Sequence, residues 1–484
     1  MDSVHRRRYD RNLRRKTLVY ALALMLVIAC TSDNDSAGVG GSLLRIDDEP
    51  PGANCEFGGS AVHTGVDAND DGELADDEIT ETQYVCDDDP NVLVGKLSGN
   101  YTIRNELDAL FLAQVTEITG DLWIDAPGLT SIALPSLQIV GGDIVFLEAG
   151  DLELVAFPVL TTAGSPDTEE ALDTGNVGVR SGGVELDVSS LAELNGDVLL
   201  GGVIIDVSMP MLVSIRGRLA ITADTPTLSF PKLTSIGGLG LSIDQTAVEN
   251  LDGFAALTDV QYQVRLTNNQ LLQDVSGLSL VSGDLTRLRI SGSPLVEDLS
   301  GLEGITGVSS LYLANNAALQ TLSGLNGLQS VWSLYLGQHP SITSLAGLSS
   351  LTSVTKVSLH ANPLLSEPGP LLTSTALRTV YLRDNGFTSL AFPQNEFEEF
   401  TVAEESNLTA ITAPNLTATS AFLVVQSCPT LSSISMPLLD SVSTGLFTSN
   451  PNLPACSIDA LLAQLSSKNP TWTNTGNDDA ATCP

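Results

Sequence analysis

A short apolar triplet returns at nearly constant intervals between residues 264 and 385, and it restricts the fold of this 484-residue chain more than any other feature. Each triplet places a variable residue between two apolar ones, as in Leu311-Tyr312-Leu313. The triplets begin at residues 264, 288, 311, 334, 357 and 380, so one step is 24 residues long and four are 23. Such a period predicts a solenoid, because one unit cannot bury its own apolar face and must stack on the next.

Strand alternation should turn the two outer residues of each triplet inward and the middle one outward. An asparagine stands five positions after the first apolar residue in four units, at Asn269, Asn316, Asn362 and Asn385. We expect this residue to turn the chain and its amide to satisfy backbone groups that the turn leaves unpaired.

The segment LYLANNAALQTL at 311–322 resembles the leucine-rich repeat. Flanking segments differ from it: ITGDLWI at 118–124, LTSIALPSL at 129–137 and FPKL at 230–233 resemble receptor L-domains, a right-handed β-helix variant of that repeat. The two resemblances cover most of residues 91–455. They imply an all-β dominated repeat solenoid, of the right-handed β-helix or leucine-rich repeat kind, with short helical caps.

The N-terminus has the form of an export signal over residues 1–29. An Arg-rich start precedes an apolar run of about a dozen residues, whereas about 20 are needed to span a bilayer. The sequence VIAC at 27–30 resembles the lipobox of bacterial lipoproteins, which implies that Cys30 is lipidated and anchors the chain at the outer membrane or cell surface. An ordinary secretory signal with a chance cysteine is the alternative. Residues 30–50 are small, polar and acidic, and predict a flexible tether.

Residues 51–90 predict a small module around a calcium loop. The segment DANDDGELADDE at 67–78 fits the twelve-position EF-hand loop. We expect a structural Ca²⁺ ion bound by the side chains of Asp67, Asn69, Asp71 and Glu78 and by the backbone carbonyl of Glu73. The loop lacks the long helix that precedes an EF-hand, which argues against a calcium sensor. An acidic turn that binds no ion is the alternative.

The cysteines suggest two disulfides, as befits an exported chain. Cys55 and Cys86 bracket the calcium-like loop and are expected to pair, stabilising a unit too small for its own core. Cys456 and Cys483 flank a helical pattern at 457–465, so residues 456–484 predict a disulfide-clipped cap on the open end of the stack. Cys428 takes the position of the turn asparagine and is expected to be buried.

The charge distribution argues against a nucleic-acid partner. The formal net charge is −37, and the export signal holds 7 of the 21 basic residues but only 2 of the 58 acidic ones. The remaining 14 basic and 56 acidic residues cannot neutralise many phosphates. A chain of this kind suits an extracellular surface.

Several basic and aromatic residues are expected on the outer face of the repeat sheet. We call them the candidate strip: Arg265, Arg287, Arg289, Tyr312, Tyr335, Lys356, His360, Tyr381 and Arg383. Arginine and aromatic side chains carry much of the energy at binding surfaces, so the strip predicts a binding face for an extracellular or envelope protein or glycan. The alternative is that tyrosine is favoured on exposed strands and that the arginines pair with neighbouring acids.

The motifs of catalysis are missing from the sequence. Outside the signal the only histidines are His63, His339 and His360, and there is no nucleophile elbow or zinc-binding helix motif. We therefore expect a binding protein rather than an enzyme. A structural or adhesive surface component and a carbohydrate-active β-helix enzyme are the alternatives.

Overall fold

The structure is a computed structural model that describes residues 42–55, 58–66, 68–69, 71–86, 95–146, 152–164, 177–466, 471–481 and 483. The chain divides into two compact units, Met1–Leu93 and Val94–Pro484. The predicted export signal and Cys30 lie outside the described residues. No helix in the described part of the chain is long and apolar enough to cross a membrane.

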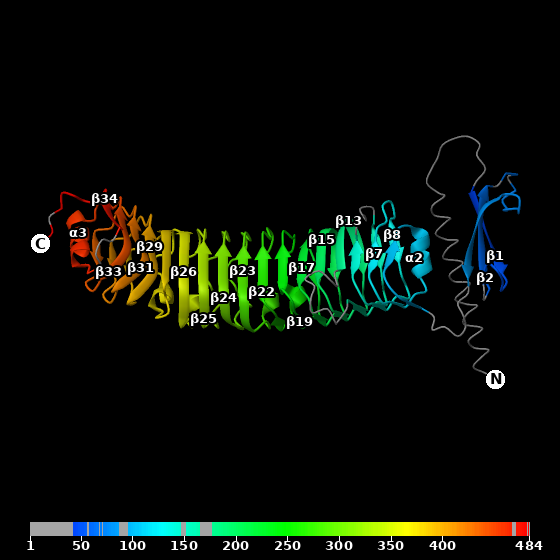
Figure 1. The fold of residues 1–484 in the computed structure, drawn as a ribbon, viewed down its shortest axis with the longest axis horizontal. Coiled ribbons are helices and arrows are strands. Elements are labelled where there is room, and N and C mark those ends of the chain that lie inside the picture. The colour runs from blue at the N-terminus through cyan, green and yellow to red at the C-terminus, as the bar shows by residue number, and fades with distance from the viewer. Residues whose placement is uncertain are drawn as a thin grey trace. The chain divides into compact units, whose positions relative to one another are not determined.

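The first unit is a three-stranded antiparallel sheet of β1 (Ser42–Glu49), β2 (Gly59–Val66) and β3 (Ile79–Cys86) (Figure 1). The tether predicted for residues 30–50 is wrong for 42–49, because these residues pair with β2 along their whole length. The Arg45 side chain holds β1 to the loop before β3, donating to the Leu74 carbonyl at 2.7 Å and to Asp76 at 2.6 Å.

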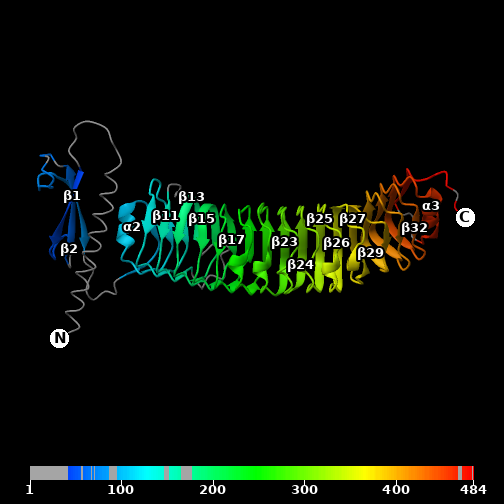
Figure 2. The same ribbon diagram turned by 180° about the vertical axis from the view of Figure 1, so that it is seen from behind.

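The second unit is a β-solenoid of about 15 turns, which confirms the predicted fold class (Figures 1 and 2). One main sheet of 20 strands runs along it. Its members in chain order are β5 (Tyr101–Ile103), β7 (Leu122–Ile124), β8 (Ser131–Ala133), β10 (Ile144–Phe146), β11 (Leu154–Ala156), β13 (Val177–Asp187), β15 (Val198–Ser208), β17 (Leu219–Ala223), β18 (Leu228–Ser229), β20 (Leu241–Asp244), β22 (Gln263–Thr267), β23 (Gly283–Ser291), β24 (Ile305–Ala314), β25 (Ser330–Gly337), β26 (Ser353–Asn362), β27 (Thr379–Asn385), β29 (Glu396–Ala403), β31 (Ala418–Gln426), β33 (Ser441–Thr448) and β34 (Thr471–Thr475).

The parts of each turn between the main strands change along the chain. The first turns carry an eight-stranded sheet made of β4 (Lys96–Leu97), β6 (Glu117–Ile118), β9 (Ile139–Val140), β12 (Thr162–Ala163), β14 (Glu193–Leu194), β16 (Ser214–Ile215), β19 (Ser235–Ile236) and β21 (Asp259–Val260). In the regular 23-residue turns, 3-10 helices continue the row of β18, since η1 packs on β18 and η2 on η1; they are η1 (Asp252–Phe254), η2 (Ser276–Leu278), η3 (Ala346–Leu348) and η4 (Gly369–Thr373). Strands return in the last turns as β28 (Ser389–Ala391), β30 (Ala410–Thr412) and β32 (Ser433–Ser435). The two sequence patterns therefore correspond to two kinds of turn.

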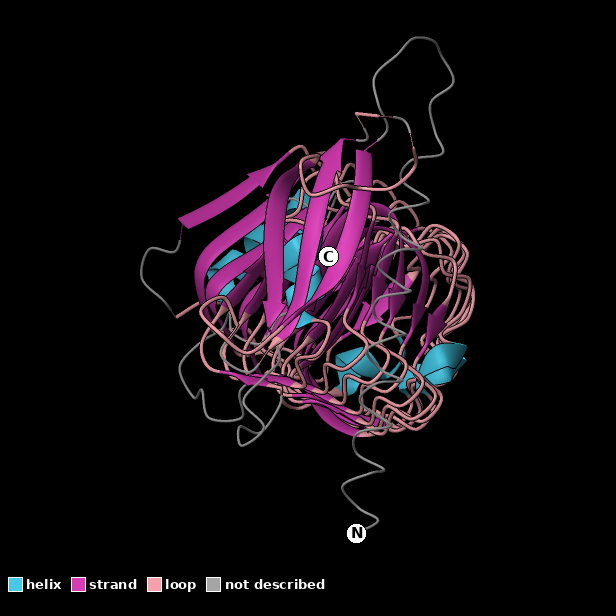
Figure 3. Ribbon diagram, turned by 90° about the vertical axis from the view of Figure 1, so that its right-hand side faces the viewer, coloured by secondary structure: helices cyan, strands magenta, loops and turns pink. Residues whose placement is uncertain are grey.

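The core is one continuous column of apolar side chains from Ile103 to Leu461. The triplets fill it as the alternation predicts: Leu311 and Leu313 are buried, while Tyr312 between them is partly exposed. Figure 3 looks along the stack, so that successive turns lie one behind another.

The turn after each regular strand uses a residue in the left-handed region followed by a buried polar residue. Asn315 has φ +55° and precedes the buried Asn316. The amide of Asn316 donates to the Ile290 carbonyl at 3.0 Å and accepts from the Ser293 N–H at 3.0 Å, so it links its own turn to the preceding one. The same arrangement recurs at Asn269, Asn362 and Asn450, as the spacing predicts for the first two.

Both ends of the solenoid carry a helix. At the N-terminal end α2 (Glu106–Leu112) begins after Asn105, whose side chain accepts from the N–H groups of Leu107 and Asp108. At the C-terminal end α3 (Ala455–Gln464) covers the last turns, and the predicted disulfide between Cys456 and Cys483 is present.

Candidate functional site

Parallel strands in register arrange the outward residues of β22 to β27 in columns. The central column contains, from one turn to the next, Arg265, Arg289, Tyr312, Tyr335, Ser358 and Tyr381. A second column two residues earlier holds Arg287 and Lys356, and a third two residues later holds His360 and Arg383. The structure thus brings all nine residues of the candidate strip onto one face over six turns.

Rings and cations of the strip stack on one another along the solenoid axis. Tyr312 and Tyr335 have ring centroids 4.6 Å apart and planes inclined by 7°. The guanidinium of Arg289 lies 4.3 Å from the centroid of the Tyr312 ring, on the continuation of this column. Such contacts are each worth roughly 0.5–1.5 kcal/mol, so they hold the side chains in fixed positions. Burial, with the neighbouring Tyr312 and Tyr381, raises the pKa of the Tyr335 phenol.

Two arginines of the strip form ion pairs within the solenoid. Arg383 binds both carboxylate oxygens of Glu404 at 2.8 Å, and this pair raises the pKa of the guanidinium. Arg265 lies 3.7 Å from Asp244. In contrast, Arg287, Arg289 and Lys356 form no ion pair with any described residue.

Two aromatic residues join this face without having been predicted. Trp332 is 56% exposed and lies under Lys356, whose Nζ is 5.0 Å from its ring centroid. Tyr262 lies 5.9 Å from the guanidinium carbon of Arg287. Both stand just outside the triplets and their immediate neighbours, so the repeat pattern does not point to them. The signal in the sequence is an aromatic residue about one period before a basic one: Lys356 follows Trp332 and Arg287 follows Tyr262.

Three titratable groups replace the turn asparagine and are buried inside the solenoid. Burial raises the pKa of the Glu405 carboxyl to about 7, although its oxygens accept from Asn385. Burial also raises the pKa of the Cys428 thiol to about 11 and lowers that of His339 to about 4. Cys428 is a free, fully buried thiol, as predicted. These groups have no exposed surface through which they could act on a ligand.

The calcium-like loop of the first unit is closed by its own hydrogen bonds. The Glu78 carboxylate accepts from the N–H groups of Ala68 at 2.8 Å and Ala75 at 3.0 Å, so it lies inside the loop as the last EF-hand ligand does. Asn69 accepts from the N–H of Asp71 at 2.9 Å, and Asp71 from that of Glu73 at 2.9 Å.

The loop matches the EF-hand pattern at two points. Gly72 has φ +83°, which suits the turn at position six, and the side chains of Asn69, Asp71 and Glu78 accept hydrogen bonds from backbone N–H groups of the loop. The first predicted ligand, Asp67, lies outside the described residues. Among the residues that are described, no cluster of three or more His, Cys, Asp or Glu side chains is arranged to hold a metal. Cys55 is disulfide-bonded, while the side chain of its expected partner Cys86 lies outside the description.

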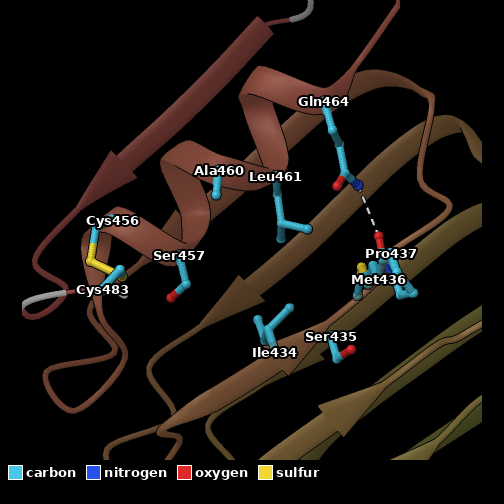
Figure 4. A pocket seen from close by; sticks show the side chains of 10 residues that line it. All are labelled: Ile434, Ser435, Met436, Pro437, Cys456, Ser457, Ala460, Leu461, Gln464 and Cys483. Carbon is cyan, nitrogen blue, oxygen red and sulfur yellow. Dashed lines mark hydrogen bonds between the residues drawn. A yellow bond between two sulfur atoms is a disulfide. The ribbon is translucent and has the colours of Figure 1, made fainter.

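A hollow of about 320 Å³ lies between α3 and the turn that carries β32 (Figure 4). Gln464 spans it, donating to the Met436 carbonyl at 2.8 Å and to that of Leu439 at 3.0 Å. Its lining includes Ile434, Leu461 and the Cys456–Cys483 disulfide, so it lies where the cap packs on the last turns.

Comparison with known families assigns only the first unit. Residues 41–86 match a family described as a domain of unknown function (DUF7151). The matched segment contains β1, β2, β3 and the calcium-like loop, which supports treating β1 as part of this unit. None of the curated proteins that were compared matches the chain.

Proposed function

We propose that this protein is exported, is anchored through lipid on Cys30 at the outer membrane or cell surface, and binds an extracellular or envelope protein or glycan with the main sheet of its solenoid. The Arg-rich N-terminus, the VIAC sequence and the acidic remainder of the chain support export and anchoring. The candidate strip supports binding.

One observation carries this proposal. In a chain of net charge −37, a single sheet face gathers Arg287, Arg289 and Lys356 on aromatic rings and leaves them without an acidic partner among the described residues. A cation held in this way is partly desolvated and oriented in advance, which lowers the entropy lost on binding. A surface that served solubility alone would gain nothing from this arrangement in an acidic protein.

The test is a pull-down from envelope extract with the mature protein as bait. We expect the triple variant Arg289→Ala, Tyr312→Ala and Tyr335→Ala to lose the partner while the solenoid stays folded. A control variant carries Lys232→Ala and Leu364→Ala, which are exposed in turns away from this face, and should retain it. Equal recovery of the partner by the wild type, the triple variant and the control variant would reject the strip as the binding surface.

A structural or adhesive role is the second candidate. The Arg383–Glu404 and Arg265–Asp244 pairs and the Tyr312–Tyr335 stack satisfy these side chains within the solenoid. In that case the triple variant would unfold at lower denaturant concentration and no partner would be recovered. An activity on polysaccharides that depends on one acidic residue would instead favour an enzyme.

The anchor has its own test. Cells that express the wild-type chain should incorporate labelled palmitate into it, and the Cys30→Ala variant should not be labelled. Label that persists in the variant would contradict lipidation at Cys30.

Calcium binding by the first unit belongs to the same proposal, with the ion in a structural role. The carboxylate and amide oxygens of Asp67, Asn69, Asp71 and Glu78 and the Glu73 carbonyl are the hard ligands that Ca²⁺ prefers. Calorimetry on the full chain should show heat of calcium binding that Asp67→Ala removes. Absence of that heat in the wild type would reject the ion.

A further inference from the structure

The column of tyrosines has one missing ring. Tyr312, Tyr335 and Tyr381 occupy the same position on β24, β25 and β27, and Ser358 takes that position on β26 between them. Adjacent strands lie about 4.8 Å apart, so Tyr335 and Tyr381 are separated by roughly 9–10 Å along the axis. A hydroxymethyl group thus stands where the pattern would place a phenol ring. We call this position the break at Ser358.

The two tyrosines that flank the break point in the same direction. The ring of Tyr335 lies across Gly337, since a Cβ placed on that glycine would come 2.7 Å from the Tyr335 hydroxyl. The Tyr381 hydroxyl contributes to the raised pKa of Arg383, so it lies close to Arg383, which occupies the same column as Gly337. A flat group placed over Ser358 would therefore continue the stack that Tyr312 and Tyr335 begin.

The ring faces available to a ligand are those at the break. Arg289 covers one face of Tyr312 and Tyr335 covers the other. Among described residues Tyr335 stacks only on Tyr312, and no ring contact joins it to Tyr381. The faces of Tyr335 and Tyr381 that are turned toward Ser358 are thus free of aromatic partners in the described part of the chain.

The groups around the break select an anionic ligand. Lys356 and His360 stand two residues before and after Ser358 on the same strand. Lys356 has no described acidic partner, and His360 has a buried Nδ1 atom without a hydrogen-bond partner. Three turns along the same face, Arg289 and Arg287 add two further cations without ion pairs. This face therefore carries unpaired cations on β26 and on β23, on either side of Tyr312 and Tyr335.

We propose that the break at Ser358 takes one pyranose ring of a linear anionic glycan between the faces of Tyr335 and Tyr381, with acidic groups of the glycan meeting Lys356 beside the break. The inference rests on the proposed function and specifies its ligand. Because a glycan chain runs roughly in the plane of its rings, a ring stacked between Tyr335 and Tyr381 directs the neighbouring sugars along the strand direction, where an acidic group can meet Lys356. An extended peptide is a poorer match, because peptides add to sheet edges or enter grooves, whereas here each strand of this face is already paired on both sides.

The decisive variant is Ser358→Tyr, which fills the break with the protein's own ring. Its matched control is Ser242→Tyr, because Ser242 lies in the same column next to Arg265, five turns away from Ser358. Calorimetry on the mature protein uses four probes: oligogalacturonate, dextran sulfate, neutral cellohexaose and poly-L-glutamate. The first two distinguish carboxylate from sulfate as the acidic group.

We expect wild type and Ser242→Tyr to bind an anionic glycan equally, and Ser358→Tyr to bind it roughly tenfold or more weakly. Tyr381→Ser removes one of the two rings that flank the break and adds no bulk, so it should also weaken binding. Weaker binding by both variants would show that the effect of Ser358→Tyr does not come from misfolding. Neutral cellohexaose should bind less tightly than either anionic probe.

Three results would overturn the inference. They are no binding of either anionic glycan, undiminished binding by Ser358→Tyr, and tighter binding of poly-L-glutamate than of the glycans. The proposed function is judged separately by the pull-down. If the triple variant loses a partner while no glycan binds the wild type, the strip binds another ligand and only the present inference fails.

Discussion

At the scale of single residues, Glu405 shows how a buried charge enters the solenoid. It stands where other turns have asparagine, and its two oxygens accept from the amide and the N–H of Asn385. The carboxyl is fully buried, so its charged form loses hydration that two hydrogen bonds replace only in part.

The first prediction concerns the pH dependence of stability. Burial raises the pKa of Glu405 from 4.5 to about 7, so the folded state binds a proton that the unfolded state releases. Its contribution to stability is present below pH 4.5 and is lost as the pH rises to about 7, at a cost of at most about 3 kcal/mol. Glu405→Gln mimics the protonated acid and should raise the urea midpoint at pH 8 much more than at pH 5.

Glu404→Gln is the control for this measurement, since Glu404 is exposed and pairs with Arg383 at the surface. Its effect should stay below about 1 kcal/mol at both pH values. A Glu405→Gln protein that keeps the pH dependence of the wild type would show that Glu405 is not the group responsible.

The second prediction concerns the buried asparagines. Asn316→Ala removes the partners of the Ser293 N–H and the Ile290 carbonyl, both inside the solenoid. Leaving them unpaired should lower the free energy of unfolding by about 2–4 kcal/mol. Asn315→Gly, at the exposed neighbour with φ +55°, should change it by less than about 1 kcal/mol. Similar losses in both variants would show that the hydrogen bonds of the buried asparagine are not a source of stability.

At the scale of elements, the turn that ends each regular strand has the same backbone conformation each time, while the residue type at its left-handed position varies. The residue before the buried turn residue has a φ between +54° and +67° in turn after turn. The residues at this position include Gln245, Ala361, Glu404 and Ser427. For these residues the left-handed region is sterically less favourable than for glycine.

The third prediction follows from that cost. Ala361→Gly should stabilise the protein by up to about 1 kcal/mol, because Ala361 has φ +55°. Ala410→Gly, within strand β30, should destabilise it by about 0.5–1 kcal/mol. Thermal unfolding of the two variants measures the difference, and a loss of stability in both would show that the turn is not strained.

The elements also show what the sequence could predict. The triplets and Asn316 were predictable because spacing and alternation determine which residues face inward. The place of Glu405 at the position of the turn asparagine was not predictable, since it comes 20 residues after Asn385 rather than 23 and has a different side chain. Strand β1 was missed because its acidic composition suggests a tether, whereas Arg45 and pairing with β2 hold it in the sheet.

The candidate strip was predictable as a set of residues on one face, but not as a set of contacts. The sequence placed Tyr312 and Tyr335 one turn apart, and the structure added the stacking of their rings. Trp332 was missed because it lies three positions before Tyr335, beyond the neighbours that the period assigns to this face. Side-chain reach, rather than backbone register, decides such contacts.

At the scale of the whole solenoid, each turn touches mainly its neighbours, so the ends depend on caps. The fourth prediction is that Cys456→Ser with Cys483→Ser loosens the C-terminal end. The disulfide closes a loop of sequence separation 27, and its loss should cost about 3 kcal/mol. Hydrogen exchange should accelerate in β33 and β34 and stay unchanged in β22 to β27. Uniform acceleration would mean that the solenoid unfolds as one unit.

The central claim is that the main sheet face over β22 to β27 is where the partner binds. Site-directed photocrosslinking tests it most directly: the chain carries p-benzoylphenylalanine at Tyr335 or, in a second protein, at Leu364 in the turn after β26, and is irradiated with envelope extract. The account predicts a crosslinked partner from position 335 and none from 364. Equal yields from both positions, or a partner captured only from 364, would contradict it.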